Sequence, residues 1–104
     1  MSGICSGSSI QQRISEIKKR LNEVDKIIQD SEKCMQLSYQ EIAFQKECKQ
    51  SSYREHNYGA IEACQAAIDG EYDCIHAIKE GLRERNAERS ELVRELRMLK
   101  LHIG

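Results

Sequence analysis

Apolar residues in the first half of this sequence recur at alternating intervals of four and three, and this spacing restricts the fold more than any other feature. The unbroken part of the series is Ile10, Ile14, Ile17, Leu21, Val24 and Ile28. Such a heptad pattern, with apolar residues at places a and d of seven places lettered a to g, puts one apolar stripe on a helix that packs against another helix. Met35 and Ile42 continue the frame, although Ser31, Ser38 and Gln45 weaken it.

The second half of the chain carries a heptad frame of its own. Its apolar members are Ile61, Cys64, Ile68, Ile75, Ile78, Leu82, Leu92, Leu96, Leu99 and Ile103, whereas Glu71, Arg85 and Arg89 occupy stripe places without being apolar. The chain contains no proline, so nothing inside either half forces a helix to break. Two long helices with facing apolar stripes are therefore predicted.

The predicted boundaries come from the polar stretches. Residues 1–9 are rich in Ser and Gly and predict a flexible tail, and Ser9 with Gln12 has the arrangement of a helix-capping box. The stretch from Lys49 to Gly59 has no apolar period and contains Asn and Gly, which favour turns. We expect residues 10–104 to form the hairpin, with a helix over 10–49, a turn over 50–58 and a helix over 59–103.

The predicted fold class is all-α, an antiparallel two-helix hairpin of the coiled-coil type. A seam between only two helices buries little apolar surface per residue. Dimerisation into a four-helix bundle, or binding of a helical partner, is therefore the expected way to cover the remaining apolar surface.

Composition and charge exclude several functions. Charged residues make up 32% of the chain and the formal net charge is −1, with acidic residues interleaved among the basic ones, so nucleic acid is not an expected partner. No apolar run reaches the roughly 18 residues that a membrane-spanning helix needs. The N-terminus has no secretory signal pattern. We expect a cytoplasmic protein, or one exported by a non-Sec route, whose partner is a helical protein or a second copy.

No pattern in the sequence indicates catalysis. There is no glycine-rich phosphate loop, no nucleophile motif and no pair of closely spaced cysteines that would start a metal site. The acidic residues are distributed as a solvated face. The sequence predicts a protein that is not an enzyme, with no catalytic residue, no metal and no cofactor.

Five cysteines are many for this length, and their order is informative. With a bend near residues 54–56, Cys34 falls opposite Cys74 and Cys48 falls opposite Cys64, while Cys5 is left over. These two pairs are candidate disulfides. The alternative is that the cysteines are free thiols, which are small apolar residues suited to a helix seam.

Interface candidates lie near the bend and in the charged part of the seam. Tyr39, Phe44, Tyr53 and Tyr58 gather where the seam is weakest and could anchor a partner, or pack locally around the turn. Arg85 and Arg89 place positive charge in the seam, and antiparallel pairing would put the acidic residues Glu23, Asp25 and Asp30 opposite them. The two arginines are either solvated, with their stems covering apolar surface, or a register lock or partner-facing site.

The plan of a polar N-terminus, two helices of similar length and a turn containing Asn57-Tyr58-Gly59 resembles the small W-x-G-type helical hairpins that accompany toxins in bacterial type VII secretion. This resemblance implies a non-catalytic chaperone or targeting subunit that bundles with the helical domain of a larger secreted protein. The sequence has no Trp, so Asn57 or Tyr58 would replace the signature aromatic residue. The spacing from Cys64 to Cys74 resembles the twin-cysteine hairpins of the mitochondrial intermembrane space, which implies a disulfide-stapled assembly or structural subunit.

Overall fold

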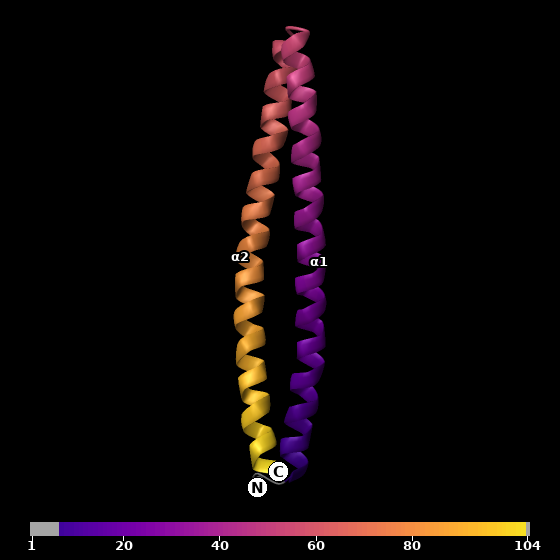
Figure 1. The fold of residues 1–104 in the computed structure, drawn as a ribbon. Helices are drawn as coiled ribbons and strands as arrows, with labels where there is room; N and C mark the ends of the chain where they lie inside the picture. The colour runs from indigo at the N-terminus through magenta and orange to yellow at the C-terminus, as the bar shows by residue number, and fades with distance from the viewer. Residues whose placement is uncertain (1–6, 104) are drawn as a thin grey trace. The chain divides into compact units, whose positions relative to one another are not determined.

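Two helices make up the whole part of the chain that the structure describes, residues 7–103 (Figure 1). In this computed structural model, α1 spans Gly7–Arg54 and α2 spans Tyr58–Ile103, and three residues connect them. The predicted all-α, antiparallel two-helix hairpin is confirmed. The residues form two compact units: a terminal unit of residues 7–29 and 83–103, and a turn unit of residues 30–82.

The helices are longer than the polar stretches suggested. α1 begins at Gly7 rather than at residue 10 and ends at Arg54 rather than at residue 49, and α2 begins at Tyr58. The predicted flexible tail over 1–9 falls mostly outside the described residues, and its last three residues belong to α1. A polar stretch that lacks an apolar period does not by itself end a helix. A helix ends where its last carbonyl groups find capping partners.

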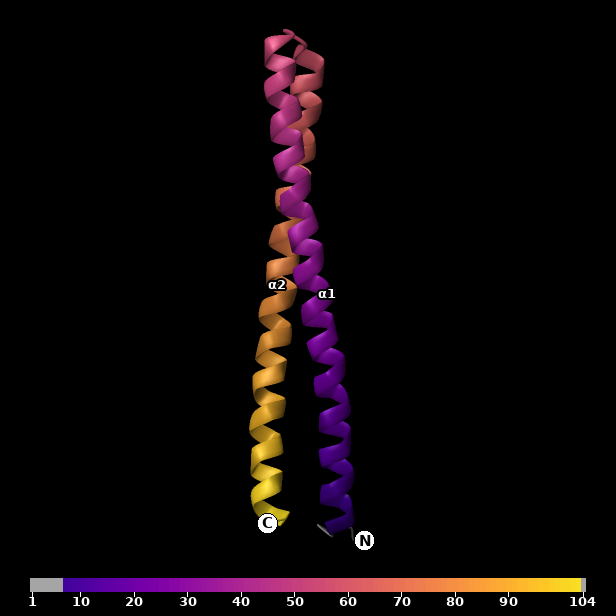
Figure 2. The same ribbon diagram turned by 45° about the vertical axis from the view of Figure 1, so that its right-hand side comes forward.

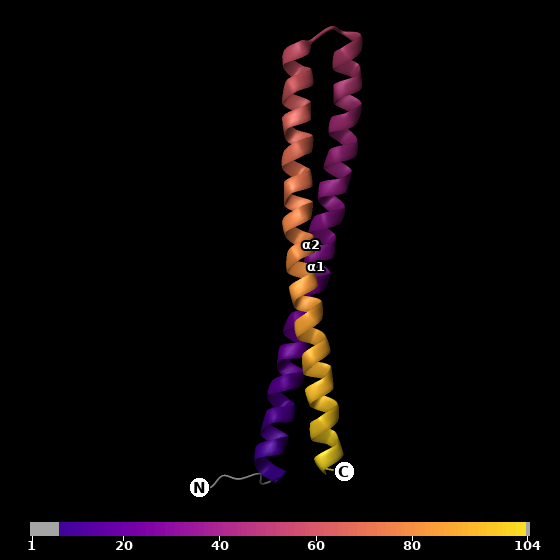
Figure 3. The same cartoon turned by 90° about the vertical axis from the view of Figure 1, so that its left-hand side faces the viewer.

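The connection between the helices is a Schellman motif followed at once by a helix N-cap. The amide N–H of Asn57 donates to the carbonyl O of Ser52 at 2.9 Å, and that of His56 donates to the carbonyl O of Tyr53 at 3.2 Å. His56 has a φ of 57°, the left-handed conformation that this motif requires and that glycine usually supplies. Figure 3 shows the short connection closing the turn unit.

Asn57 starts the second helix. Its side-chain Oδ1 accepts a hydrogen bond from the amide N–H of Ala60 at 3.2 Å, and its carbonyl O accepts one from Ile61 at 3.1 Å. A side chain that satisfies an otherwise orphaned amide is the defining contact of an N-cap. The same residue therefore ends the cap of α1 and begins α2, which is why three residues suffice for the connection.

The buried residues are those that the heptad frames predicted for the stripe. The buried apolar side chains are Ile14, Ile17, Val24, Ile42, Ile61, Cys64, Ile68 and Ile75. In the turn unit, where both helices lie side by side up to the connection (Figure 2), Ile42, Ile68 and Ile75 form one cluster against which Met35 packs. Ser52 is also buried, and its hydroxyl donates to the carbonyl O of Cys48 at 2.9 Å.

None of the helices in the described residues is both long and apolar enough to span a membrane.

His56→Gly should stabilise the hairpin by about 0.5–1 kcal/mol, because glycine adopts the left-handed conformation without the steric cost that a side chain incurs. The measurement is the free energy of unfolding by urea, followed by circular dichroism. Glu55→Gly is the matched control, since no left-handed conformation is recorded at Glu55. Equal stability changes in the two variants would contradict the motif.

Asn57→Ala should destabilise the hairpin by about 1 kcal/mol through loss of the N-cap hydrogen bond. Asn57→Asp should retain most of the stability, because a carboxylate oxygen can accept the same bond. An alanine variant as stable as the aspartate variant would mean that Asn57 does not cap α2.

Candidate protein-binding face

All four tyrosines of the chain lie at the same heptad place, e, which borders the seam on one side. Tyr39 and Tyr53 are two heptads apart on α1, and Tyr58 and Tyr72 are two heptads apart on α2. Each is between 44% and 68% exposed. In an antiparallel pair the e places of both helices border the same side of the seam, so these side chains belong to one surface of the turn unit, which we call the tyrosine face.

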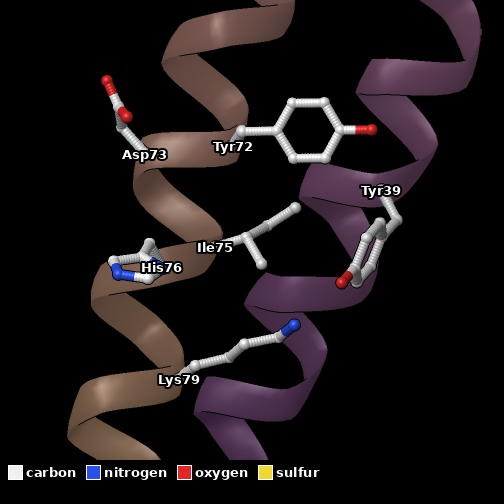
Figure 4. A pocket seen from close by; sticks show the side chains of 6 residues that line it. All are labelled: Tyr39, Tyr72, Asp73, Ile75, His76 and Lys79. Atoms are coloured by element: carbon white, nitrogen blue, oxygen red, sulfur yellow. The ribbon is translucent and has the colours of Figure 1, made fainter.

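A first open groove of about 450 Å³ lies in the tyrosine face (Figure 4). Tyr39 contributes from α1, and Tyr72, Asp73, Ile75, His76 and Lys79 contribute from α2. In Figure 4 the side chains of Tyr72, Ile75 and Lys79 reach toward α1, whereas Asp73 points away. The buried Ile75 forms the apolar floor. The groove therefore presents an aromatic residue from each helix and a lysine.

A second groove of about 420 Å³ begins where the first ends, because Tyr72 lines both. Its other lining residues are Lys46, Lys49, Gln50, Tyr53, Gln65 and Ile68. The Lys49 ammonium donates to Gln65 Oε1 at 2.5 Å and lies 6.0 Å from the centre of the Tyr53 ring. Lysines and tyrosines thus alternate along one continuous surface with no carboxylate lining the second groove.

The structure brings together some of the predicted interface residues and separates others. Tyr39 and Tyr53 line the grooves, and Tyr58 lies on the same side at the start of α2. Phe44 is 56% exposed but occupies place c, which lies toward the opposite side of α1. Tyr72, which joins the grooves, was not predicted. The fourteen-residue spacing from Tyr58 to Tyr72, equal to that from Tyr39 to Tyr53, would have identified it.

Arg85 and Arg89, the predicted cationic candidates, lie in the terminal unit and each has a carboxylate partner there. Arg89 Nε donates to Asp25 Oδ1 at 2.7 Å across the two helices. Arg85 Nη1 donates to Glu88 Oε1 at 2.8 Å within α2. The predicted position of Asp25 opposite this segment is thus observed, and the role of both arginines in partner binding stays a prediction.

The terminal unit also contains two interhelical ion pairs that the sequence reading did not anticipate. Arg13 makes a two-pronged pair with Glu95 at 2.6 and 2.9 Å, and Arg20 makes one with Glu88 at 2.6 and 3.1 Å. All four residues occupy place g, one heptad apart on each helix. The hydrogen bonds from Arg20 lower the pKa of Glu88, and those from Arg13 lower the pKa of Glu95, against an opposing contribution from desolvation.

The four cysteines within the described residues are free thiols. Cys34 and Cys74 are exposed, Cys48 is half-buried and Cys64 is buried in the seam. Cys34 and Cys74 directly precede Met35 and Ile75, which belong to one packed cluster, so both flank the same part of the core. The pairings of Cys34 with Cys74 and of Cys48 with Cys64 stay predictions, and Cys5 lies outside the described residues.

Within residues 7–103 no group of three or more His, Cys, Asp or Glu side chains converges as a metal site would require. In comparisons with known proteins, the chain matches no protein family, no curated protein and no solved structure. The tyrosine face is therefore the feature from which a function can be inferred.

Acid should destabilise the terminal unit through Glu88 and Glu95. A carboxyl whose pKa is lowered in the folded state contributes stability above its unfolded pKa, about 4.3, and that contribution is lost as the pH falls through the folded pKa. Glu88→Gln should therefore reduce the difference between melting temperatures measured at about pH 7 and about pH 3.

Glu47→Gln is the matched control for the acid experiment, because Glu47 is exposed and has no recorded ion pair. If both variants retain the full acid sensitivity of the wild type, the ion pairs of Glu88 do not contribute to stability.

Proposed function

We propose that this hairpin is a non-catalytic binding protein, an adaptor or chaperone, whose tyrosine face holds a helix of another protein. The observation that carries the proposal is the collection of every tyrosine of the chain on one side of the turn unit, around two adjoining grooves. Tyrosine provides a large contact area with few rotatable bonds, and it is enriched among residues that dominate binding energy.

The shape of the grooves favours a helix over a small molecule. Both are open, and each is lined from both helices, with buried Ile75 or Ile68 at the base. An amphipathic helix that places apolar side chains at three- and four-residue intervals can fill such a row of depressions along a two-helix surface. Neither groove is an enclosed pocket that would surround a small ligand.

The charges of the tyrosine face indicate which charge the partner helix carries. Lys46 and Lys79 line the grooves, and within the described residues neither forms an ion pair. Lys49 is bonded to a neutral amide, that of Gln65. Carboxylates of a partner could approach these ammonium groups without displacing an existing ion pair. The proposed partner helix therefore carries apolar residues bordered by Asp or Glu.

The resemblance to type VII accessory hairpins would make this partner the helical N-terminal domain of a secreted toxin. That narrower assignment rests on the resemblance, whereas the proposal of a helical partner rests on the tyrosine face.

The test is co-expression of the hairpin with each helical protein encoded beside its gene, followed by measurement of the complex by titration calorimetry. Tyr39→Ala combined with Tyr72→Ala should weaken binding by about 2 kcal/mol or more, roughly 30-fold, because both side chains anchor the first groove. Lys46→Glu should slow association and reduce its dependence on salt.

Phe44→Ala is the matched control, since it removes an exposed aromatic side chain that lies off the tyrosine face. Binding that is insensitive to the tyrosine pair, or equally sensitive to Phe44→Ala, would contradict the proposed site. Absence of any complex with the encoded helical proteins would count against the adaptor function.

A further inference from the structure

The side of the turn unit opposite the tyrosine face is bordered by heptad places c and g, and over residues 34–48 and 60–81 these places hold a single charged residue. On α1 these places are occupied by Cys34, Leu37, Glu41, Phe44 and Cys48. On α2, from Ala60 to Gly81, they hold only Ala, Gly and Cys. We call this surface, over residues 34–48 and 60–81, the apolar flank.

Large apolar side chains stand exposed on the α1 part of the apolar flank. Leu37 is 63% exposed and Phe44 is 56% exposed, and they are one heptad apart. Glu41, the single charged residue of the flank, accepts a hydrogen bond from Gln45 of the same helix at 3.0 Å. Exposed apolar side chains aligned along a helix are typical of a surface that another helix covers.

The α2 part of the flank carries only small side chains, so its surface lies lower than that of the α1 part. Gly70 and Gly81 lie inside the helix, where glycine is less stable than alanine. A methyl group added at either position would have no neighbour within 4 Å, so the packing of the hairpin itself does not require glycine there. Small residues at these positions leave room for side chains that come from outside the hairpin.

The scarcity of charge at these places is confined to the turn unit. In the terminal unit the same heptad places hold Arg13 and Arg20 on α1 and Glu88 and Glu95 on α2, which pair with each other across the helices. The g places therefore carry interhelical ion pairs in one unit and, apart from Glu41, uncharged residues in the other.

We propose that the apolar flank binds the apolar flank of a second copy of this chain in a twofold-symmetric dimer. A twofold axis that runs parallel to the helices, in the plane between the two flanks, places α1 of each copy over α2 of the other, so that Leu37 and Phe44 of one copy meet the small residues around Gly70 of its partner. A surface with its own raised side chains and its own low strip is self-complementary, as a twofold interface requires.

The area of the flank is sufficient for a stable dimer. Twenty-one helical steps from Ala60 to Gly81 extend about 32 Å, and two adjacent helices are about 20 Å wide. Each copy would bury roughly 600 Å², or about 1,200 Å² in total, which reaches the lower range of specific interfaces. A single Glu41 per copy adds little repulsion, whereas a surface of like charges would oppose pairing.

This inference does not rest on the partner-binding function, because the tyrosine face lies on the other side of the seam and stays accessible in such a dimer. Loss of the dimer and loss of the helical partner are expected from different substitutions.

The experiment is sedimentation velocity of the full chain, with reductant present to keep the thiols reduced, from about 1 to 100 μM. The wild type should dimerise within this range. Ala63→Arg and Phe44→Arg should each raise the dissociation constant about tenfold or more, because each buries an unpaired charge at the interface. Both positions are exposed in the single hairpin, so helicity by circular dichroism should be unchanged.

Ala66→Arg is the matched control. Ala66 is an exposed alanine on the same helix at place f, directly away from the seam, and its substitution should leave the dissociation constant at the wild-type value. The proposal is overturned if the wild type is a monomer throughout the range. A dimer unaffected by Ala63→Arg and Phe44→Arg, or one disrupted by Tyr39→Ala with Tyr72→Ala, would overturn it equally.

Discussion

The packing of one apolar stripe per helix against the other is the interaction on which the rest of this structure depends. The stripes contain every buried apolar residue in the described chain, and Ile17 and Val24 are almost fully buried between the helices. Two helices with a single shared seam have no further core. Whatever lies beside the seam, at places e and g, is therefore at least partly open to solvent and free to take a separate function.

The two units use these bordering places differently. In the terminal unit four g places are occupied by Arg13, Arg20, Glu88 and Glu95, whose two-pronged pairs link α1 to α2 and set which residues face each other. In the turn unit the g places carry cysteine, alanine, glycine and one glutamate, Glu41, and the e places carry tyrosine, lysine, glutamine and one glutamate, Glu32. The unit held together by ion pairs uses its charges internally, whereas the turn unit leaves its lysines and tyrosines exposed, which is the reason the candidate binding surfaces both lie there.

Three residues are enough to reverse the chain direction between the two helices. A Schellman motif satisfies the last carbonyl groups of α1, and Asn57, the residue after its left-handed position, satisfies an amide of α2. The sequence reading placed the turn correctly within a polar stretch but made it too long, because polar composition alone does not show where helical hydrogen bonding stops. His56 holds the left-handed position, whereas Gly59, the apparent turn residue, lies inside α2.

The sequence by itself determined the two helices, their antiparallel pairing and the residues of the seam, because a heptad period puts one apolar stripe on each helix and a short turn between two helices makes them antiparallel. It also predicted Glu23, Asp25 and Asp30 opposite the cationic segment of α2, where Asp25 pairs with Arg89. Only the tertiary structure decided which exposed residues of one helix lie beside which residues of the other. Tyr39 and Tyr72 are far apart in sequence and meet in one groove, while Phe44, close to Tyr39 in sequence, belongs to another side of α1. The physical reason is that a helical period fixes the direction of each side chain around its own helix, whereas the register between two helices is set by contacts across the seam.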